Sequence, residues 1–167
     1  MERSGNEEAA VAKVRVFLEG NGYEKIICRT NETIKTVDDA AKAVGAPPEE
    51  ILKSILLLAD GKPVLALMSG PNRVDFRKVK SLLGAKKVSM AKPEWVFEFS
   101  GYKVGGVPPV GYDKQPLSLI DETLFNHDVV WAAAGTEHAF FPVSPEELKR
   151  LTGGKACDIS KNPAPSD

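Results

Sequence analysis

The chain has 167 residues, 43% hydrophobic and 27% charged, which is typical of one globular domain with a sizeable core. Its net charge of −1 excludes a globally basic nucleic-acid-binding protein. No apolar run approaches the ~18 residues that span a bilayer, and the first residues are polar, so we expect a cytoplasmic protein with no membrane partner. Two cysteines and two histidines, none in a ligand spacing, predict a protein without a disulfide, a metal site or a cofactor.

The apolar pattern predicts helices and strands in alternation. In chain order we expect a helix at 7–19, a strand at 25–29, a helix at 37–44, a helical turn at 47–50, strands at 51–59 and 62–68, a helix at 75–83, a strand at 86–90, a helix at 94–99, strands at 117–120, 129–134 and 139–143, and a helix at 145–151. Thr36 and Ser144 each precede an acid by three residues, the spacing of a capping box. These elements predict a single α+β domain with a mixed, mostly antiparallel sheet over residues 1–159, and a flexible tail at 160–167.

The clearest strand signal contains one charged residue. Residues 51–59 are nearly all apolar, as in a strand buried on both faces, but Lys53 interrupts them. A lysine in this position can hold a phosphate, a ribose hydroxyl or a carbonyl oxygen, and burial would lower its pKa. Alternatively, its stem lies along the strand while the ammonium group reaches water.

Residues 101–111 have the composition of a shaped loop, since six of the eleven are Gly or Pro. Glycine allows a backbone to approach a ligand closely, and the two prolines stiffen the loop. One interpretation is a rigid loop that presents its remaining backbone N–H groups to a carbonyl or phosphate oxygen, those of Gly105, Gly106, Val107, Val110 and Gly111. The other is a surface turn without a binding role.

Three further features leave alternatives open. The small residues from Ala132 to Gly135 indicate close approach either of a ligand or of a packed helix. Asp121 follows an apolar strand, where its carboxylate can bind an amine or cap the next helix. Between Arg73 and Lys92 seven basic residues accompany one acid, a local charge that suits either phosphate contacts or a solvated helix face.

Taken together, these residues resemble the YbaK-type aminoacyl-tRNA editing domains, which include free-standing deacylases related to the insertion domain of bacterial prolyl-tRNA synthetase. The resemblance runs from about Thr36 to Leu151. It depends on the order and spacing of four marks: the strand lysine Lys53, the glycine loop at 101–111, Asp121 at a strand end, and the Gly135 turn before a last helix.

The resemblance implies a compact, barrel-like mixed sheet surrounded by helices. It also implies hydrolysis of the ester that joins a mischarged small amino acid to tRNA, by water attack, with backbone amides stabilising the oxyanion. The implied catalytic positions are Lys53, Gly105 and Gly106. The implied substrate-binding positions are Thr36, Val107, Pro109, Asp121, Ala133 and Gly135. The implied tRNA contacts are Arg73, Arg77, Lys78 and Lys80, and the expected partners are the acceptor end of a mischarged tRNA and an aminoacyl-tRNA synthetase.

Two positions depart from the family pattern and bear on the amino acid removed. Pro108 stands where many relatives have a small polar residue, and Ala133 where some have a serine. Both weigh against cysteine specificity. The rival interpretations of the chain are a non-catalytic module of the same fold that binds tRNA or a synthetase, and a nucleotide-binding domain that uses the glycine loop.

Overall fold

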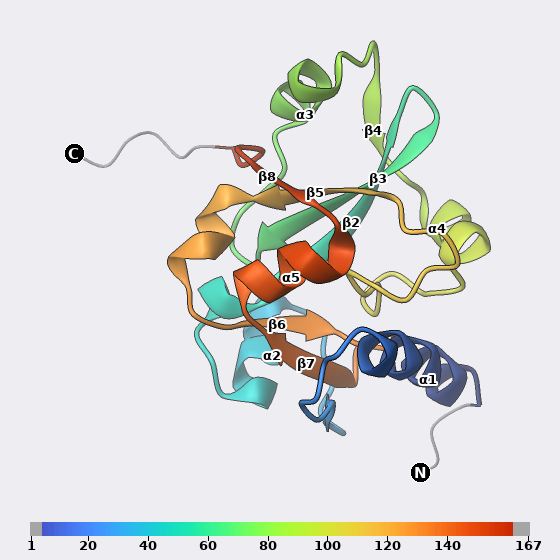
Figure 1. Ribbon diagram of the computed structural model, residues 1–167, viewed down its shortest axis with the longest axis vertical. Helices are drawn as coiled ribbons and strands as arrows, with labels where there is room; N and C mark the ends of the chain where they lie inside the picture. Colours follow the sequence, from blue (N-terminus) through green and yellow to red (C-terminus); the bar gives the residue numbers. More distant parts are fainter. Residues whose placement is uncertain (1–4, 162–167) are drawn as a thin grey trace.

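The computed structural model describes residues 5–161, with side chains described from residue 7 onward. Figure 1 shows the arrangement of its elements. The helices are α1 (Gly5–Gly20), α2 (Val37–Val44), α3 (Phe76–Leu83), α4 (Pro93–Ser100) and α5 (Pro145–Thr152), with 3₁₀ turns η1 (Pro48–Glu50) and η2 (Glu122–Asn126). The strands are β1 (Cys28–Arg29), β2 (Leu52–Ala59), β3 (Lys62–Ser69), β4 (Val88–Met90), β5 (Leu117–Asp121), β6 (Val130–Ala133), β7 (Ala139–Val143) and β8 (Lys155–Cys157).

Local signals account for several element boundaries. The predicted capping box at Thr36 is confirmed, because its hydroxyl accepts from the Asp39 N–H at 3.1 Å while the Asp39 carboxylate accepts from the Thr36 N–H at 3.2 Å. Ser144 caps α5 by accepting from the Glu147 N–H at 3.1 Å. The hairpin predicted between β2 and β3 is also confirmed, and Ala59 faces Lys62 across its turn.

The strands form two sheets. The larger has the order β4-β2-β3-β5-β8, in which β4, β2 and β3 are antiparallel and β3, β5 and β8 are parallel. The smaller, β1-β7-β6, is antiparallel throughout. The predicted α+β domain with a mixed sheet is therefore confirmed.

The expected barrel-like closure is wrong, because the sheets do not close on each other. On the edge of β2 away from β3, the ladder with β4 covers only Leu57–Ala59, and β6 meets this edge through the single bridge between Ile51 and Trp131. The stretch of β2 between these contacts has no ladder partner on that edge among the described strands. Pattern reasoning could not show this, because the register of distant strands fixes it.

Both faces of the larger sheet are covered, as the apolar β2 sequence predicts. One face packs against α1, α5 and the smaller sheet, with Val14, Leu148 and Phe141 in the shared core. The other packs against α3, with Val79 and Leu119 in a second core. In Figure 1, α3 and β4 lie at one end of the molecule, and β6 and β7 lie toward the other. None of the helices within residues 5–161 is long and apolar enough to cross a membrane.

The C-terminal part is more ordered than the sequence indicates. The short strand β8 has no periodic signal and is absent from the elements that the sequence predicts. Ser160, where the flexible tail is expected to begin, is only 4% exposed and pairs with Val74. The ordered segment therefore extends past the predicted boundary, while residues 162–167 of that tail lie outside the described part of the chain.

The two cysteines lie in different surroundings, which predicts different thiol reactivity. Cys28 is exposed, whereas Cys157 is buried against the second core, and burial raises the pKa of its thiol to about 11. Because the thiolate is the reactive form, we expect one thiol per chain to react rapidly with a disulfide reagent at pH 8. Cys157 should react only when the chain unfolds. Rapid reaction of two thiols in the native protein, or of one in Cys28→Ser, would contradict the burial of Cys157.

Candidate functional site

A cavity of about 280 Å³ opens where the free edge of β2 faces the 101–111 loop and the end of β6. Lys53, Ser54, Gly105, Val107, Ala133 and Phe140 are among the residues that line it, with Thr36 from the cap of α2. The structure thus brings together the strand lysine and the glycine loop, which are about fifty residues apart in sequence. It also places Thr36, Val107 and Ala133, three of the predicted substrate-binding residues, on the same cavity.

The loop is held through its carbonyl groups. Tyr112 Oη donates to Pro108 O at 2.7 Å, Gln115 Nε2 donates to Pro109 O at 2.8 Å, and Tyr102 Oη donates to Gly111 O. The N–H groups of Gly105 and Val107 have no hydrogen-bond partner among residues 5–161. A loop fixed on its acceptor side, with free donors at a cavity, can bind a carbonyl or phosphate oxygen without rearrangement.

Gly105 and Gly106 differ in what surrounds them. Gly105 has a φ of +99°, and a Cβ built on it would meet nothing within 4 Å. A Cβ on Gly106 would lie 2.6 Å from Thr136 Cα, and the Gly106 N–H already donates to Lys103 O at 2.9 Å. The predicted pair of donors is therefore reduced to Gly105, with Val107 as the second free N–H. Gly106 is small because the backbone of the Gly135 turn packs against it.

Three predicted substrate-binding residues lie away from this cavity, two of which, Gly135 and Pro109, are glycine or proline. Gly135 packs on α1, since a Cβ there would be 2.8 Å from Ala10 O, so the helix-packing alternative holds at this position. Pro109 is buried within the loop, and it is the Gln115 side chain that binds its carbonyl group. Neither residue is among those that line the cavity, and Gly135 lines a separate one of about 160 Å³.

Lys53 points from the cavity toward the loop after β3. It is partly buried, and its Nζ donates to the backbone oxygen of Asn72. Burial, and then the positive charge of Arg73, hold the pKa of the Lys53 ammonium group below its usual range. The lysine is thus oriented by one hydrogen bond and retains donors for an anionic or carbonyl group.

Asp121 is fully buried and does not line the cavity. Its carboxylate accepts from the Thr123 N–H at 3.2 Å and the Ile159 N–H at 3.0 Å, and from the hydroxyl groups of Thr123 and Ser160. The cap of η2 is therefore the role that the structure shows, and the remaining bonds tie this turn to the C-terminal segment.

The model of the aminoacyl-tRNA editing domain family matches residues 31–151, most of the chain. The chain belongs to this family. A protein described as a candidate trans-editing enzyme for prolyl-tRNA synthetase has a solved structure that aligns with a TM-score of 0.88 and 34% identity, over 96% of this chain and 100% of that one. The fold expected from the resemblance is thus confirmed, apart from the barrel-like closure.

The curated relatives of this editing domain include synthetases. Proline–tRNA ligase of Bacillus licheniformis is 40% identical over 83 residues, which is 50% of this chain and 14% of the ligase. The chain thus corresponds to a small part of that enzyme. The uncharacterized protein YwhH of Bacillus subtilis is 29% identical over 129 residues, covering 76% of this chain and 82% of YwhH.

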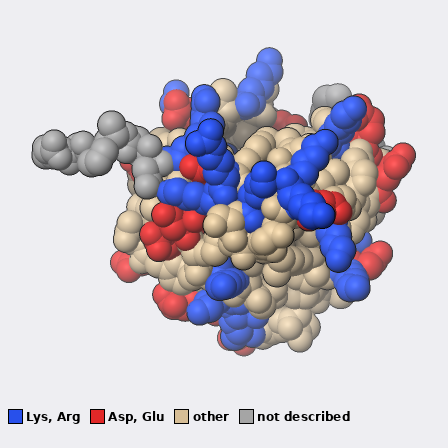
Figure 2. Space-filling view, turned by 90° about the horizontal axis from the view of Figure 1, so that it is seen from above, with Lys and Arg blue, Asp and Glu red and all other residues tan. Residues whose placement is uncertain are grey.

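A basic surface lies at the end of the editing domain that carries α3 and β4. Figure 2 looks down on the end that carries α3 and β4, and Lys and Arg side chains gather on this face. Arg73, Arg77 and Lys80 are exposed. Lys78 is partly buried, and its Nζ lies 3.0 Å from the Asp158 carboxylate. Of the four predicted tRNA contacts, three are therefore exposed cations, and the fourth is committed to an ion pair within the domain.

Sequence reasoning missed several residues of the site. Ser54 lines the cavity, and its buried Oγ has no hydrogen-bond partner in the described part of the chain. Its position after Lys53 in an apolar strand was the available signal. Asn72 gave no signal, because its backbone oxygen is what contacts Lys53. Within residues 5–161, no group of three or more His, Cys, Asp and Glu side chains is placed to hold a metal ion.

Proposed function

We propose that this editing domain is a trans-acting aminoacyl-tRNA deacylase that hydrolyses the ester of a tRNA mischarged with a small amino acid. The observation that carries the proposal is the cavity shared by Lys53 and Gly105, in a chain whose family is defined by aminoacyl-tRNA editing. The solved relative described as a candidate trans-editing enzyme supports action on a tRNA bound by prolyl-tRNA synthetase.

The reaction needs few groups from the protein. An aminoacyl ester is already activated, so water can attack its carbonyl carbon directly, and the ribose oxygen leaves with a proton as the C–O bond breaks. The tetrahedral intermediate carries an oxyanion, which the free N–H groups of Gly105 and Val107 would stabilise. Loss of one such donor typically raises the barrier by about 3 kcal/mol.

Lys53, on β2, is one of the residues that line the cavity. In the proposal it binds the terminal adenosine through a phosphate or a ribose hydroxyl and so sets the ester opposite Gly105. Its partial burial strengthens this interaction, because the local dielectric is lower than that of water.

Among small amino acids, the cavity walls favour an apolar side chain. Ile51, Val107, Ala133 and Phe140 make its lining mostly apolar. Alanine therefore fits this lining better than threonine or a charged residue does. Discrimination between side chains that differ by one methylene is modest, about 10- to 200-fold, so we expect a preference among small amino acids and not absolute selection.

The basic surface gives a separate prediction about tRNA. The double substitution Arg77→Ala, Lys80→Ala should weaken tRNA binding and reduce the slope of log K against log salt concentration by about 1.8, or about 0.9 for each phosphate that is no longer neutralised. Hydrolysis of a minimal aminoacyl-adenosine ester, which lacks the acceptor stem, should be unchanged. Lys149→Ala on α5 is the matched control, since Lys149 is also an exposed lysine. An unaltered salt slope in the double variant would remove α3 from the tRNA-binding surface.

Turnover tests the proposed function against the binding-module alternative. The wild-type protein is incubated with tRNA charged separately with alanine, serine, cysteine and threonine, and release of the amino acid is followed under multiple-turnover conditions. We expect catalytic release for at least one small amino acid, with alanine fastest. Tight binding without release for any of the four would leave the chain as a tRNA-binding module.

A further inference from the structure

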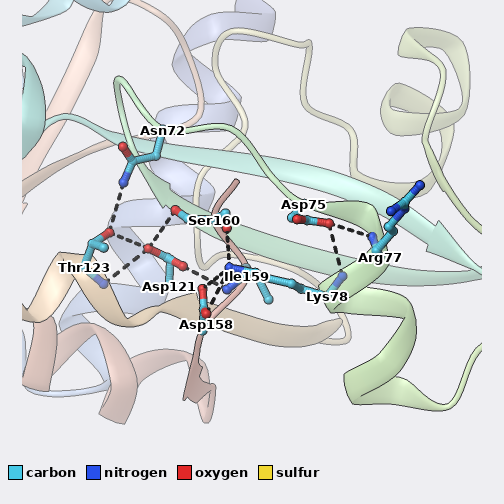
Figure 3. Close-up of polar contacts among 9 residues, drawn as sticks. All are labelled: Asn72, Asp75, Arg77, Lys78, Asp121, Thr123, Asp158, Ile159 and Ser160. Carbon is cyan, nitrogen blue, oxygen red and sulfur yellow. Dashed lines mark hydrogen bonds and ion pairs between the residues drawn. The ribbon is translucent and has the colours of Figure 1, made fainter. Parts of the chain in front are cut away.

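Asp121 joins η2 to the C-terminal segment almost forty residues further along the chain, as Figure 3 shows. Its carboxylate binds the hydroxyl of Thr123 in η2, the hydroxyl of Ser160 at 3.1 Å and the N–H of Ile159 at 3.0 Å. Asp121 is 0% exposed. Ile159 and Ser160 lie beyond residue 151, where the match to the family model ends. We call Asp121, Thr123 and Ser160 the Asp121 cluster.

The Asp121 cluster connects to Lys53 through Asn72. Because the Thr123 hydroxyl donates its hydrogen to Asp121, its lone pairs are available as acceptors, and Asn72 Nδ2 donates to it at 3.1 Å. The backbone oxygen of the same Asn72 accepts from Lys53 Nζ. A buried carboxylate thereby fixes the polarity of a hydrogen-bond chain that ends on the cavity lysine.

The C-terminal segment holds this loop from a second side. The Asp75 N–H donates to Ile159 O at 2.7 Å, and the Lys161 N–H donates to Arg73 O at 2.8 Å. Val74 and Ser160 form an antiparallel bridge between these bonds. The residues around the Asn72 carbonyl are therefore anchored by backbone pairing as well as by the cluster.

We propose that the Asp121 cluster is a positioning device for Lys53. It holds the Asn72 carbonyl in the one place where that group can orient the ammonium at the cavity, so Thr123 and Asp121 act on the substrate only through Lys53. The importance of the Asp121 cluster for catalysis rests on the proposed function, whereas the positioning of Lys53 does not depend on that function. A buried network with all its partners in place is rigid, as such a role needs.

The reactivity of the Lys53 amine tests the positioning without any substrate. Native protein is labelled for short times with an amine-reactive ester, and the Lys53 peptide is quantified by mass spectrometry against the exposed Lys42 and Lys149. Thr123→Val removes the hydroxyl at nearly constant shape, and Thr123→Ser retains it. Thr152→Val is the matched control, because it removes another hydroxyl that donates within the fold, to Leu148 O at 2.8 Å, without contact to the Asp121 cluster.

Thr123→Val should speed labelling of Lys53 several-fold, up to about tenfold if the bond to Asn72 is lost outright, because the bond favours the protonated amine. Thr123→Ser and Thr152→Val should label at the wild-type rate. Equal Lys53 labelling in all four proteins, or an equal rise in Thr152→Val, would overturn the proposal. If Thr123→Val does not fold, Asn72→Ala removes the same link at the loop, with the same expected and contradicting results.

Deacylation then connects the cluster to function. With mischarged tRNA as substrate, kcat/KM should fall about tenfold in Thr123→Val and recover in Thr123→Ser, within the loss of up to 10²-fold that a small misplacement of a catalytic group can cause. A wild-type protein without turnover would refute the proposed function, and the labelling result would still decide the positioning claim.

Discussion

Replacing Lys53 with alanine is expected to lower kcat/KM for deacylation by about 100-fold, which corresponds to about 2.7 kcal/mol. Lys53 lines the cavity and is partly buried, and its ammonium group is already oriented by the Asn72 carbonyl. In the proposed mechanism a bound phosphate or hydroxyl would therefore lose a charge-assisted hydrogen bond in a site of low dielectric. Multiple-turnover kinetics on the preferred aminoacyl-tRNA measure the effect.

Stability should distinguish this loss from general damage. The pKa of Lys53 is depressed by burial and by Arg73, so its charge does not favour folding, and Lys53→Ala should leave the free energy of unfolding nearly unchanged. Lys149→Ala is the control for loss of an exposed lysine. Wild-type turnover by Lys53→Ala would remove the lysine from the site, and with it the main reason for locating the reaction in this cavity.

Gly106→Ala is expected to cost about 3 kcal/mol of unfolding free energy, at the upper end for overpacking. A Cβ on Gly106 would stand 2.6 Å from Thr136 Cα and 2.9 Å from Thr136 N, and backbone atoms cannot move aside as a flexible side chain can. Urea denaturation at neutral pH measures the change.

Gly45→Ala provides the comparison for this prediction. Gly45 ends α2 with a φ of +72° and has open space around it, so alanine there meets only the cost of a left-handed backbone, about 1 to 2 kcal/mol. If Gly106→Ala proved less destabilising than Gly45→Ala, the close packing of the loop on the Gly135 turn would be wrong.

The features that the sequence predicts well are those set by interactions between neighbouring residues. The capping box at Thr36, the N-cap at Ser144 and the β2–β3 hairpin each follow from a few adjacent residues, and each appears in the structure, although at Ser144 only the hydroxyl half of the predicted capping box forms. The apolar run of β2 predicted burial on both faces, because such a composition needs cover on both sides whichever elements provide it. The loop at 101–111 was recognised from its Gly and Pro content alone.

Contacts between distant segments account for what the sequence could not predict. Glycine in a pattern does not show whether open space or another backbone surrounds it. The structure leaves open space around Gly105, whereas backbone atoms pack against Gly106 and Gly135. Asp121 read alone could bind an amine or cap a helix. Its bonds to Ile159 and Ser160 depend on a C-terminal segment without any periodic signal.

In the proposed mechanism the acyl carbonyl of the substrate lies against the free N–H groups of the 101–111 loop, beside Lys53. Titration of ¹⁵N-labelled protein with an amide-linked mimic, 3′-alanylamino-3′-deoxyadenosine, tests this placement through the backbone amide resonances. We predict the largest shifts at Gly105 and Val107, a smaller one at Gly106, whose N–H is bonded to Lys103 O, and little effect from adenosine alone. Shifts centred on Asp121 or on α1, with Gly105 and Val107 unmoved, would contradict the mechanism.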